Sequence, residues 1–286
     1  MNIHWYPGHM TKSKRIIMAD VSLCDVVVEL LDARIPLSSR NPDIREITAG
    51  KKHIIVLNKA DLAEEGVTAK WVNFYASQGT HAIAAKSNSS KHQTAVIQAA
   101  EALMRKKHEK QKSKGRVGVT TRAIVLGIPN VGKSTLINQY ARRQAAAAAD
   151  RPGVTRGRQW VRISPVFELL DTPGILWPKV DDPDVSALLA LTGAVKETIP
   201  DMTELALYGL KLLRDITPAA VKTRYKVDFT EDESDFALLE KIGAARGFRL
   251  TGGAVDLERA AVTLVHEFRD GKLGRVSLER PEIMEQ

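Results

Sequence analysis

The segment GIPNVGKS at residues 127–134 decides the fold of this 286-residue chain. It fits the pattern G-x-x-x-x-G-K-[ST], follows an apolar run at residues 123–126 and precedes a helical pattern at residues 133–143. Its glycines let backbone N–H groups close around a phosphate, and a helix N-terminus behind them favours the anion. A glycine-rich turn without a ligand is the alternative. Because phosphate binding requires a strand before the loop and a helix after it, the segment predicts a phosphate-binding loop.

Two side chains of this loop have expected chemical roles. Lys133 brings a positive charge to the β- and γ-phosphate oxygens and is a predicted catalytic group, and the Ser134 hydroxyl is a predicted Mg²⁺ ligand. The predicted nucleotide contacts of the loop are Asn130, Val131, Gly132, Lys133, Ser134 and Thr135.

A second motif, DTPG at residues 171–174, follows the apolar run 167–170. An aspartate at the end of such a strand can hold the water shell of Mg²⁺, and the N–H of the motif's glycine can contact the γ-phosphate. We therefore predict Asp171 as a metal ligand and Gly174 as a nucleotide contact. A plain turn is the alternative for this tetrapeptide taken alone.

A third motif, NKAD at residues 58–61, follows the apolar run 53–57. The Asp61 carboxylate can accept hydrogen bonds from both N1–H and N2–H₂ of guanine, and each such bond contributes roughly 1.5–3 kcal/mol. Adenine lacks this pair of donors, so the motif favours guanine. The predicted base contacts are Asn58, Lys59, Ala60 and Asp61, together with Lys86 and Ser87 of the AAKS segment at residues 84–87.

The motifs stand in an unusual order along the chain. The guanine motif comes first, then the AAKS segment, the phosphate loop, Thr155 as the predicted switch threonine for Mg²⁺ and catalysis, and finally DTPG. If the five motifs are numbered G1 to G5 in the order of an ordinary GTPase, their order here is G4-G5-G1-G2-G3, which is a circular permutation. A fold tolerates such a permutation where the original termini lie close together. The basic segment 105–122 is the expected joint. It is either a strip that contacts phosphates or a solvated linker or helix end.

Alternating strand and helix patterns predict an α/β fold, a P-loop GTPase domain with a parallel sheet over residues 1–180. The expected strands are 24–31, 53–57, 82–85, 123–126 and 167–170, and the expected helices are 67–78, 92–104 and 133–143.

The pattern then turns helical, which predicts a small all-helical C-terminal domain over residues 181–286. Asp201 is an expected helix start, and Thr230 with Glu233 forms an expected capping box before the next helix. Gly247 is expected to end that helix, and residues 257–268 carry apolar residues at helical spacing.

Composition narrows the class of protein. Lys plus Arg number 42 and Asp plus Glu number 34, and the resulting net charge of +8 favours an anionic partner. The single cysteine, Cys24, excludes an intramolecular disulfide and a four-cysteine zinc site. No apolar run approaches a membrane span and no secretory signal is visible, so we expect a cytoplasmic protein without a membrane partner.

Several further segments together resemble the ribosome biogenesis GTPase A (YlqF) family of circularly permuted GTPases: WYPGHM at residues 5–10, DARIP at 32–36, SRNP at 39–42, DRPGVT at 150–155 and LDTPGILWP at 170–178. The resemblance implies binding of GTP or GDP, GTP hydrolysis, and a role in late assembly of the large (50S) ribosomal subunit. It also implies that the C-terminal helical domain contacts ribosomal RNA. We expect a monomer and no DNA partner.

The residue after DTPG is Ile175, where many GTPases have a glutamine that orients the attacking water. Hydrolysis by the chain alone is therefore expected to be slow and to depend on a partner. The resemblance implies His9 as a catalytic group that positions the water, with a structural histidine in a Pro-Gly turn as the alternative. It also implies a K⁺ ion beside Asn130. The alternative is that Asn130 has no ligand and is present because asparagine fits a left-handed turn.

Two other functions stay open from the residues alone. The absence of a water-orienting glutamine also fits a GTP-binding tether with little turnover. A GTPase that regulates a protein or membrane partner without RNA is the third hypothesis. Salt distinguishes this third hypothesis from RNA binding, because affinity that depends on RNA phosphates falls steeply as salt rises.

Overall fold

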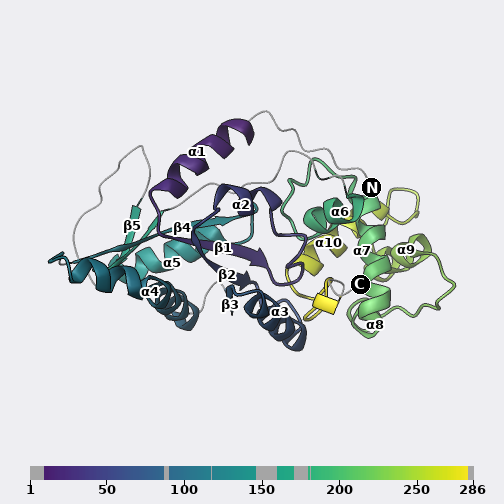
Figure 1. Cartoon of the computed structure of the whole chain (residues 1–286). Helices are drawn as coiled ribbons and strands as arrows, with labels where there is room; N and C mark the ends of the chain where they lie inside the picture. The colour runs from purple at the N-terminus through teal and green to yellow at the C-terminus, as the bar shows by residue number, and fades with distance from the viewer. Residues whose placement is uncertain are drawn as a thin grey trace.

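A six-stranded sheet lies at the centre of the computed structural model, which describes residues 10–86, 90–116, 118–145, 160–170, 180 and 182–282. The strand order is β3-β2-β1-β4-β6-β5 (Figure 1). Neighbouring strands are parallel, except that β5 runs antiparallel to β6. The strands are β1 (Val26–Asp32), β2 (Lys52–Asn58), β3 (His81–Ala84), β4 (Thr121–Gly127), β5 (Trp160–Ser164) and β6 (Phe167–Leu170).

Helices cover both faces of this sheet. This is seen at the central strand β1, whose alternate residues belong to different apolar clusters. Val26, Val28 and Leu30 pack with α4 and α5, whereas Val27 packs with α1 and Leu31 packs with α3. Every residue of β1 is buried, as expected for a central strand of a parallel sheet. The helices of this part are α1 (Met10–Ser22), α2 (Pro42–Ile47), α3 (Glu65–Ser77), α4 (Ser90–Lys112) and α5 (Lys133–Ala145).

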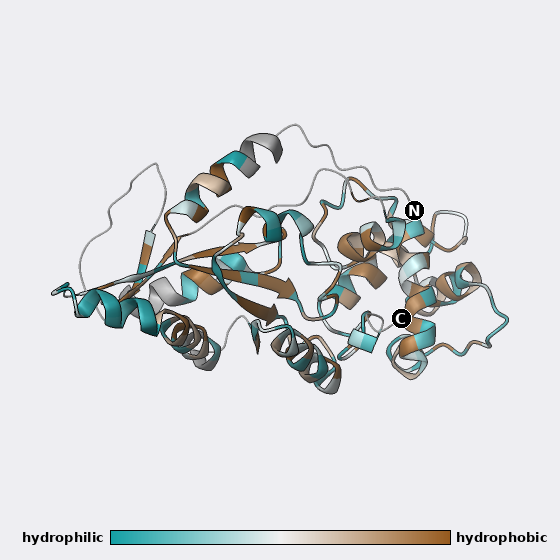
Figure 2. Cartoon of the chain, in the orientation of Figure 1, coloured by the Kyte–Doolittle hydropathy of each residue, from teal (hydrophilic) through white to brown (hydrophobic). Residues whose placement is uncertain are grey.

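Five further helices pack on one another at the end of the molecule that lies beyond the carboxyl ends of the parallel strands (Figure 1). Figure 2 shows long hydrophobic stretches in these helices, and their buried apolar residues belong to the same cluster that fills one face of the sheet. The helices of this helical unit are α6 (Pro183–Leu191), α7 (Met202–Ile216), α8 (Pro218–Tyr225), α9 (Asp235–Ala245) and α10 (Leu257–Arg269).

The chain after α10 returns to the sheet. The Val276 N–H donates to the Leu62 carbonyl, and the Leu278 N–H donates to the Arg34 carbonyl. The Glu279 carboxylate is 5% exposed and accepts from the backbone N–H groups of Leu37 and Ser38. Residues 274–280 are therefore not helical, and they fasten the helical unit to the sheet. The division into domains at residues 180 and 181 stays a prediction.

Most expected elements form within two residues of their expected ends, but two expectations need correction. The expected helix 92–104 lies within α4, which continues to Lys112. Because β4 then begins at Thr121, the basic joint is shorter than the expected residues 105–122. The capping box at Thr230 is wrong, because Ser234 is the N-cap of α9 and accepts from the Ala237 N–H. The start at Asp201 is confirmed.

Candidate nucleotide-binding site

The predicted phosphate loop connects the end of β4 to the start of α5. Gly127 has a φ of +152°, and a Cβ there would lie 2.6 Å from the Leu30 carbonyl oxygen. Asn130 and Gly132 also have positive φ, at 56° and 105°. These conformations turn the chain sharply just before the helix N-terminus, so the glycines are required by the backbone and not only by the motif.

Lys133 lies inside this turn. It is 5% exposed, and its Nζ donates to the carbonyls of Gly127 at 3.0 Å and of Ile128 at 2.6 Å. Ser134 and Thr135 are exposed at the first turn of α5. A buried ammonium, a helix N-terminus and exposed hydroxyls at one place fit an anionic phosphate chain.

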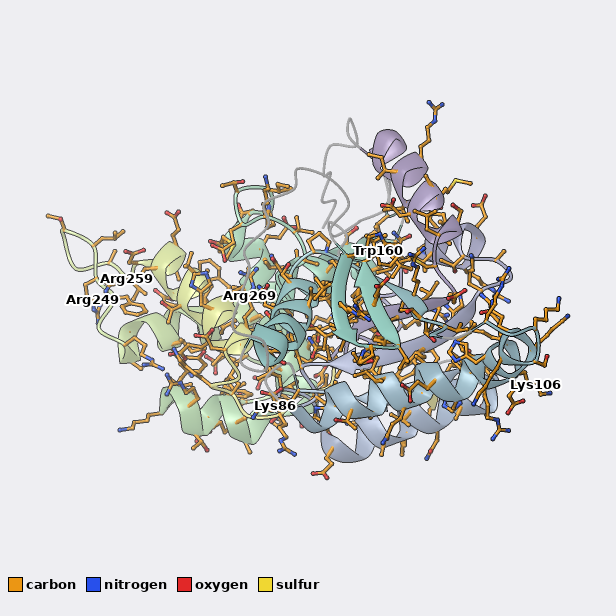
Figure 3. The ribbon with its side chains drawn as sticks, turned by 90° about the vertical axis from the view of Figure 1, so that its left-hand side faces the viewer. Lys86, Lys106, Trp160, Arg249, Arg259 and Arg269 are labelled. Carbon is orange, nitrogen blue, oxygen red and sulfur yellow. The ribbon has the colours of Figure 1, made fainter. Side chains whose placement is uncertain are left out.

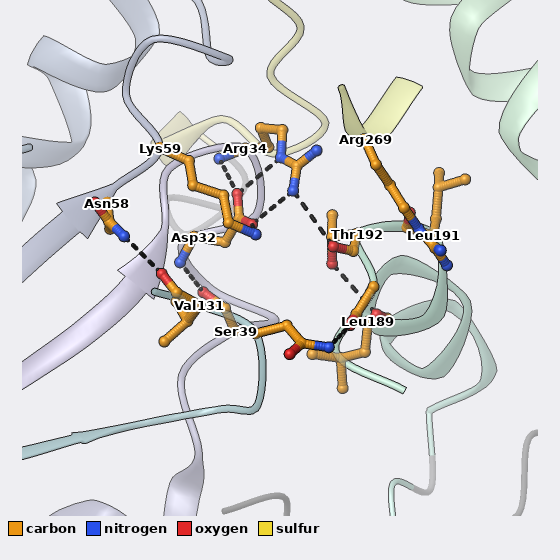
Figure 4. Close-up of polar contacts among 12 residues, drawn as sticks. Asp32, Arg34, Ser39, Asn58, Lys59, Val131, Leu189, Leu191, Thr192 and Arg269 are labelled. Atoms are coloured by element: carbon orange, nitrogen blue, oxygen red, sulfur yellow. Dashed lines mark hydrogen bonds and ion pairs between the residues drawn. The ribbon is translucent and has the colours of Figure 1, made fainter. Parts of the chain in front are cut away.

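The guanine motif reaches the phosphate loop directly, although 73 positions separate the two residues that touch. Asn58 ends β2, and its Nδ2 donates to the Val131 carbonyl at 2.6 Å. The next residue, Lys59, has a left-handed φ of 58°. The side chain of Asn58 therefore ties the base-binding loop to the phosphate loop (Figure 4).

The AAKS segment joins the same site. The Ala60 N–H donates to the Ala85 carbonyl at 3.0 Å, and Ala85 in turn donates to Leu57. Lys86 lies 3.8 Å from the Asp61 carboxylate, which is 34% exposed. A cavity of about 550 Å³ opens beside Ala60, Asp61 and Lys86, so the predicted guanine-reading carboxylate faces open space.

An ion-pair group that the sequence interpretation did not assign lies under this loop. Asp32, at the end of β1, accepts two hydrogen bonds from the Arg34 guanidinium, at 2.9 and 2.7 Å, and lies 3.1 Å from the Lys59 ammonium. Burial alone would raise the pKa of Asp32, but the two cations more than offset this effect and hold the pKa well below its ordinary value. The signal in the sequence was an aspartate at the end of an apolar run that is itself predicted as a strand.

Three parts of the chain meet at the carboxyl end of α6. Asn130 of the phosphate loop donates to the Gly193 carbonyl at 2.8 Å, and Arg34 donates to the Thr192 carbonyl at 3.4 Å. Arg269 of α10 donates to the Leu191 and Ala190 carbonyls at 3.1 and 2.8 Å. Side chains from the phosphate loop, the β1 loop and α10 thus bind consecutive carbonyls at one helix end, part of which appears in Figure 4.

The structure thus brings together most predicted nucleotide contacts, from three loops at the carboxyl ends of β2, β3 and β4. Five predicted residues lie outside the described part of the chain: His9, Ser87, Thr155, Asp171 and Gly174. Their roles stay predictions, as does the role of Asn130 beside a cation.

A phosphate loop, a guanine motif and a parallel sheet that joins them define the class of GTPases. A family model described as 50S ribosome-binding GTPase matches residues 122–222. The chain is 41% identical to Ribosome biogenesis GTPase A of Bacillus pumilus, over 99% of this chain and 100% of the relative. It is 35% identical to the Thermotoga maritima protein of the same name, over 97% and 94% of the two chains.

Two solved structures have the same fold. A GDP-bound YlqF structure superposes with a TM-score of 0.69 at 29% identity, over 94% of this chain and 100% of the other. The GNP-bound YlqF of T. maritima gives a TM-score of 0.66 at 29% identity, over 95% and 99%. The chain belongs to the ribosome biogenesis GTPase A (YlqF) family, and the predicted fold class is confirmed.

Membership of this family gives the chain GTP and GDP as its nucleotides. Among the helices of the described residues, none has the length and apolar character that crossing a bilayer requires.

Proposed function

We propose that this GTPase acts as an assembly factor in late maturation of the large ribosomal subunit. The observation that carries the GTPase assignment is the hydrogen bond from Asn58 to the Val131 carbonyl, which makes the guanine motif and the phosphate loop parts of one site. The family description and the names of the relatives support the ribosomal large subunit and its RNA as partners.

The chemistry divides among the residues of this site. Asp61 reads guanine, and Lys133 with the α5 N-terminus stabilises charge on the β- and γ-phosphates. Ser134, Thr155 and Asp171 hold Mg²⁺, which neutralises phosphate charge when bound. His9 positions the attacking water, because Ile175 can neither donate nor accept a hydrogen bond. Turnover is therefore slow until the ribosomal subunit orders the site.

A K⁺ ion beside Asn130 is part of the same proposal. The Nδ2 of Asn130 donates to the Gly193 carbonyl, which fixes the orientation of the side-chain amide. Its Oδ1 is then available as an oxygen ligand, and carbonyl oxygens suit alkali cations. Turnover in K⁺ buffer should exceed turnover in Na⁺ buffer, and equal rates would remove this ion from the account.

Nucleotide state is coupled to the position of the helical unit. The contact from Asn130 to Gly193 links the phosphate loop to the end of α6, and the contact from Arg34 to Thr192 links the loop after β1 to the same end. A shift of the phosphate loop between GTP and GDP would therefore strain the hydrogen bond from Asn130, which holds the helical unit. In this proposal the helical unit contacts ribosomal RNA. The chain acts as a monomer.

The arginines of this helical unit are not equivalent as candidates for contact with RNA. Arg269 binds backbone carbonyls and Glu197, and Arg246 binds the buried Glu267, so both are committed to the interior of the unit. Arg249 is exposed on the loop before α10, and Arg259 is exposed on α10 itself. These two, rather than all the arginines of the region, are the candidates for contact with RNA phosphates.

Binding to purified large subunits tests this function. We expect tighter association with a non-hydrolysable GTP analogue than with GDP, and loss of this difference in Lys133→Ala. Wild-type association that is equally tight with the GTP analogue and with GDP, and that Lys133→Ala retains in the same nucleotide-independent way, would favour a passive tether. Association that does not weaken with salt would favour a protein partner without RNA.

A further inference from the structure

Helix α4 extends about two turns beyond the core on which it packs. Val96, Ala100 and Met104 face the sheet and are buried, whereas residues 105–107, 109 and 110 are exposed. The extension is nevertheless fixed in place, because His108 Nε2 and Thr121 Oγ1 are 3.0 Å apart at the start of β4. Lys107 on its flank pairs with Asp25 before β1.

The exposed end carries a dense positive charge. Between residues 105 and 116, seven of twelve residues are Lys or Arg, and Glu109 is the single acid. Arg105 lies 3.8 Å from that acid, and Lys107 is paired with Asp25. Within the described part of the chain, no acidic side chain pairs with Lys106, Lys110, Lys112, Lys114 or Arg116. Figure 2 shows this end of α4 as hydrophilic throughout.

The helical geometry directs two of these lysines away from the protein. Lys106 and Lys110 are four positions apart, about 6 Å along the axis, and lie on the side opposite the line formed by Ala100, Met104 and His108. Two like charges at this spacing destabilise a helix slightly, and an anion between them removes that cost.

This basic end does not serve the nucleotide. The phosphate loop follows the carboxyl end of β4, whereas the end of α4 lies beside the opposite, amino end of that strand (Figure 1). Residues 105–116 also contain no Leu, Ile, Val, Met, Phe or Trp, so they lack the apolar face of a helix that inserts into a membrane surface. Phosphates held by charge alone fit this surface best.

We propose that the basic end of α4 together with the turn that follows it, residues 105–116, is a second RNA-binding surface that holds the phosphate backbone of folded RNA. The proposal rests on the proposed function, which supplies an RNA partner. Figure 3 places Lys106 at one end of the molecule and Arg249 and Arg259 at the other, with the sheet between them. A single large RNA that contacts both ends would be bound bivalently, which raises its affinity without a tight contact at either end.

The test compares two full-length double variants that lose the same charge. K106Q/K110Q removes the outward lysines, whereas K70Q/R280Q removes two cations that are paired with Glu282 and Glu64. Binding to a 20-base-pair RNA hairpin and to purified large subunits is measured over a range of salt, and GTP affinity and melting temperature serve as controls for folding.

For K106Q/K110Q we expect RNA affinity to fall at least about tenfold at 0.1 M salt, with a salt slope smaller by about 1.4–1.8. GTP affinity should stay unchanged, and K70Q/R280Q should bind RNA like the wild type. Equal affinity and slope for both variants would overturn the proposal. So would a loss of binding to phosphatidylglycerol vesicles without loss on RNA. Failure of wild-type protein to bind subunits at all would instead contradict the proposed function.

Discussion

Asp61 is the residue on which we propose that nucleotide choice depends. Its carboxylate faces the cavity beside Lys86 and is 34% exposed, so a guanine can reach it. Asp61→Asn replaces one charged acceptor by an amide, and we expect the preference for GTP over ATP to fall about 10- to 150-fold, which corresponds to roughly 1.5–3 kcal/mol. Dissociation constants for both nucleotides measure this ratio. An unchanged ratio would contradict the base-reading role.

Glu29 is a buried acid in the central strand that the proposed chemistry does not use. It is 1% exposed, neither carboxylate oxygen has a hydrogen bond, and Arg40 lies 3.5 Å away. Burial raises its pKa above the ordinary value, against the effect of Arg40. The folded state therefore disfavours the charged form, and Glu29 lowers stability at neutral pH but not in acid.

Glu29→Gln should accordingly raise the melting temperature at pH 7.5, and this gain should vanish near pH 4, where the wild-type carboxyl is neutral in both states. Each pKa unit corresponds to about 1.4 kcal/mol, so the gain is measurable by urea unfolding at the two pH values. Glu65→Gln, at an acid whose side chain is 89% exposed, is the control and should change little. A variant less stable than wild type at pH 7.5 would show that the pair with Arg40 outweighs burial.

At the scale of elements, the carboxyl end of α6 is bound by side chains of the phosphate loop, of the loop after β1 and of α10. Arg269→Ala leaves the Ala190 and Leu191 carbonyls without their donor and should cost about 1–3 kcal/mol of stability. Because Asn130 is held by the neighbouring Gly193 carbonyl, we also expect faster release of GDP. Stopped-flow measurement with a fluorescent GDP analogue gives this rate.

Arg246→Ala is the matched control, because Arg246 binds Glu267 inside the helical unit, away from the carboxyl end of α6. It should lower stability without changing GDP release. Equal acceleration in both variants would mean that GDP release follows general loosening of the helical unit and not the contact at α6.

The elements themselves could be predicted where local chemistry is strong. The largely apolar run of β1, the phosphate loop before α5 and the cap at Asp201 are local signals, and the structure has the strand, the loop-to-helix order and the cap where these signals predict them. The capping box failed because Thr230 and Ser234 are both suitable caps, and packing chose the second. Strand β5 and helix α1 have weak patterns, and both were missed.

The nucleotide site was predictable as a set of motifs but not as a set of contacts. The motifs named the residues of three loops, and the sheet order then placed these loops together. The contacts from Asn130 to Gly193 and from Arg34 to Thr192 join segments 63 and 158 positions apart. No periodicity or spacing reports such contacts, because they depend on how the helical unit packs against the finished sheet.

At the scale of the whole molecule, the C-terminal tail, residues 274–280, joins the helical unit to the sheet. Glu279→Ala would leave the backbone N–H groups of Leu37 and Ser38 without their acceptor. We expect a loss of about 1–3 kcal/mol and a melting temperature lower by several degrees. Calorimetry should also show a broader transition, because the two parts become less strongly joined.

Glu282→Ala provides the comparison for this change. Its partner Lys70 is exposed, and such a surface ion pair contributes about 0–1 kcal/mol. Equal melting temperatures for the two variants would show that the tail contributes little to holding the sheet and the helical unit together.

We propose that the ribosomal subunit completes a nucleotide site that hydrolyses GTP slowly on its own. GTP turnover in K⁺ buffer, measured with and without purified large subunits for the wild type and for His9→Ala, tests this proposal. We expect strong stimulation of the wild type, and loss of stimulation in His9→Ala while subunit binding is retained. Wild-type turnover that the subunits leave unchanged would contradict it and would leave a nucleotide-binding tether as the better description.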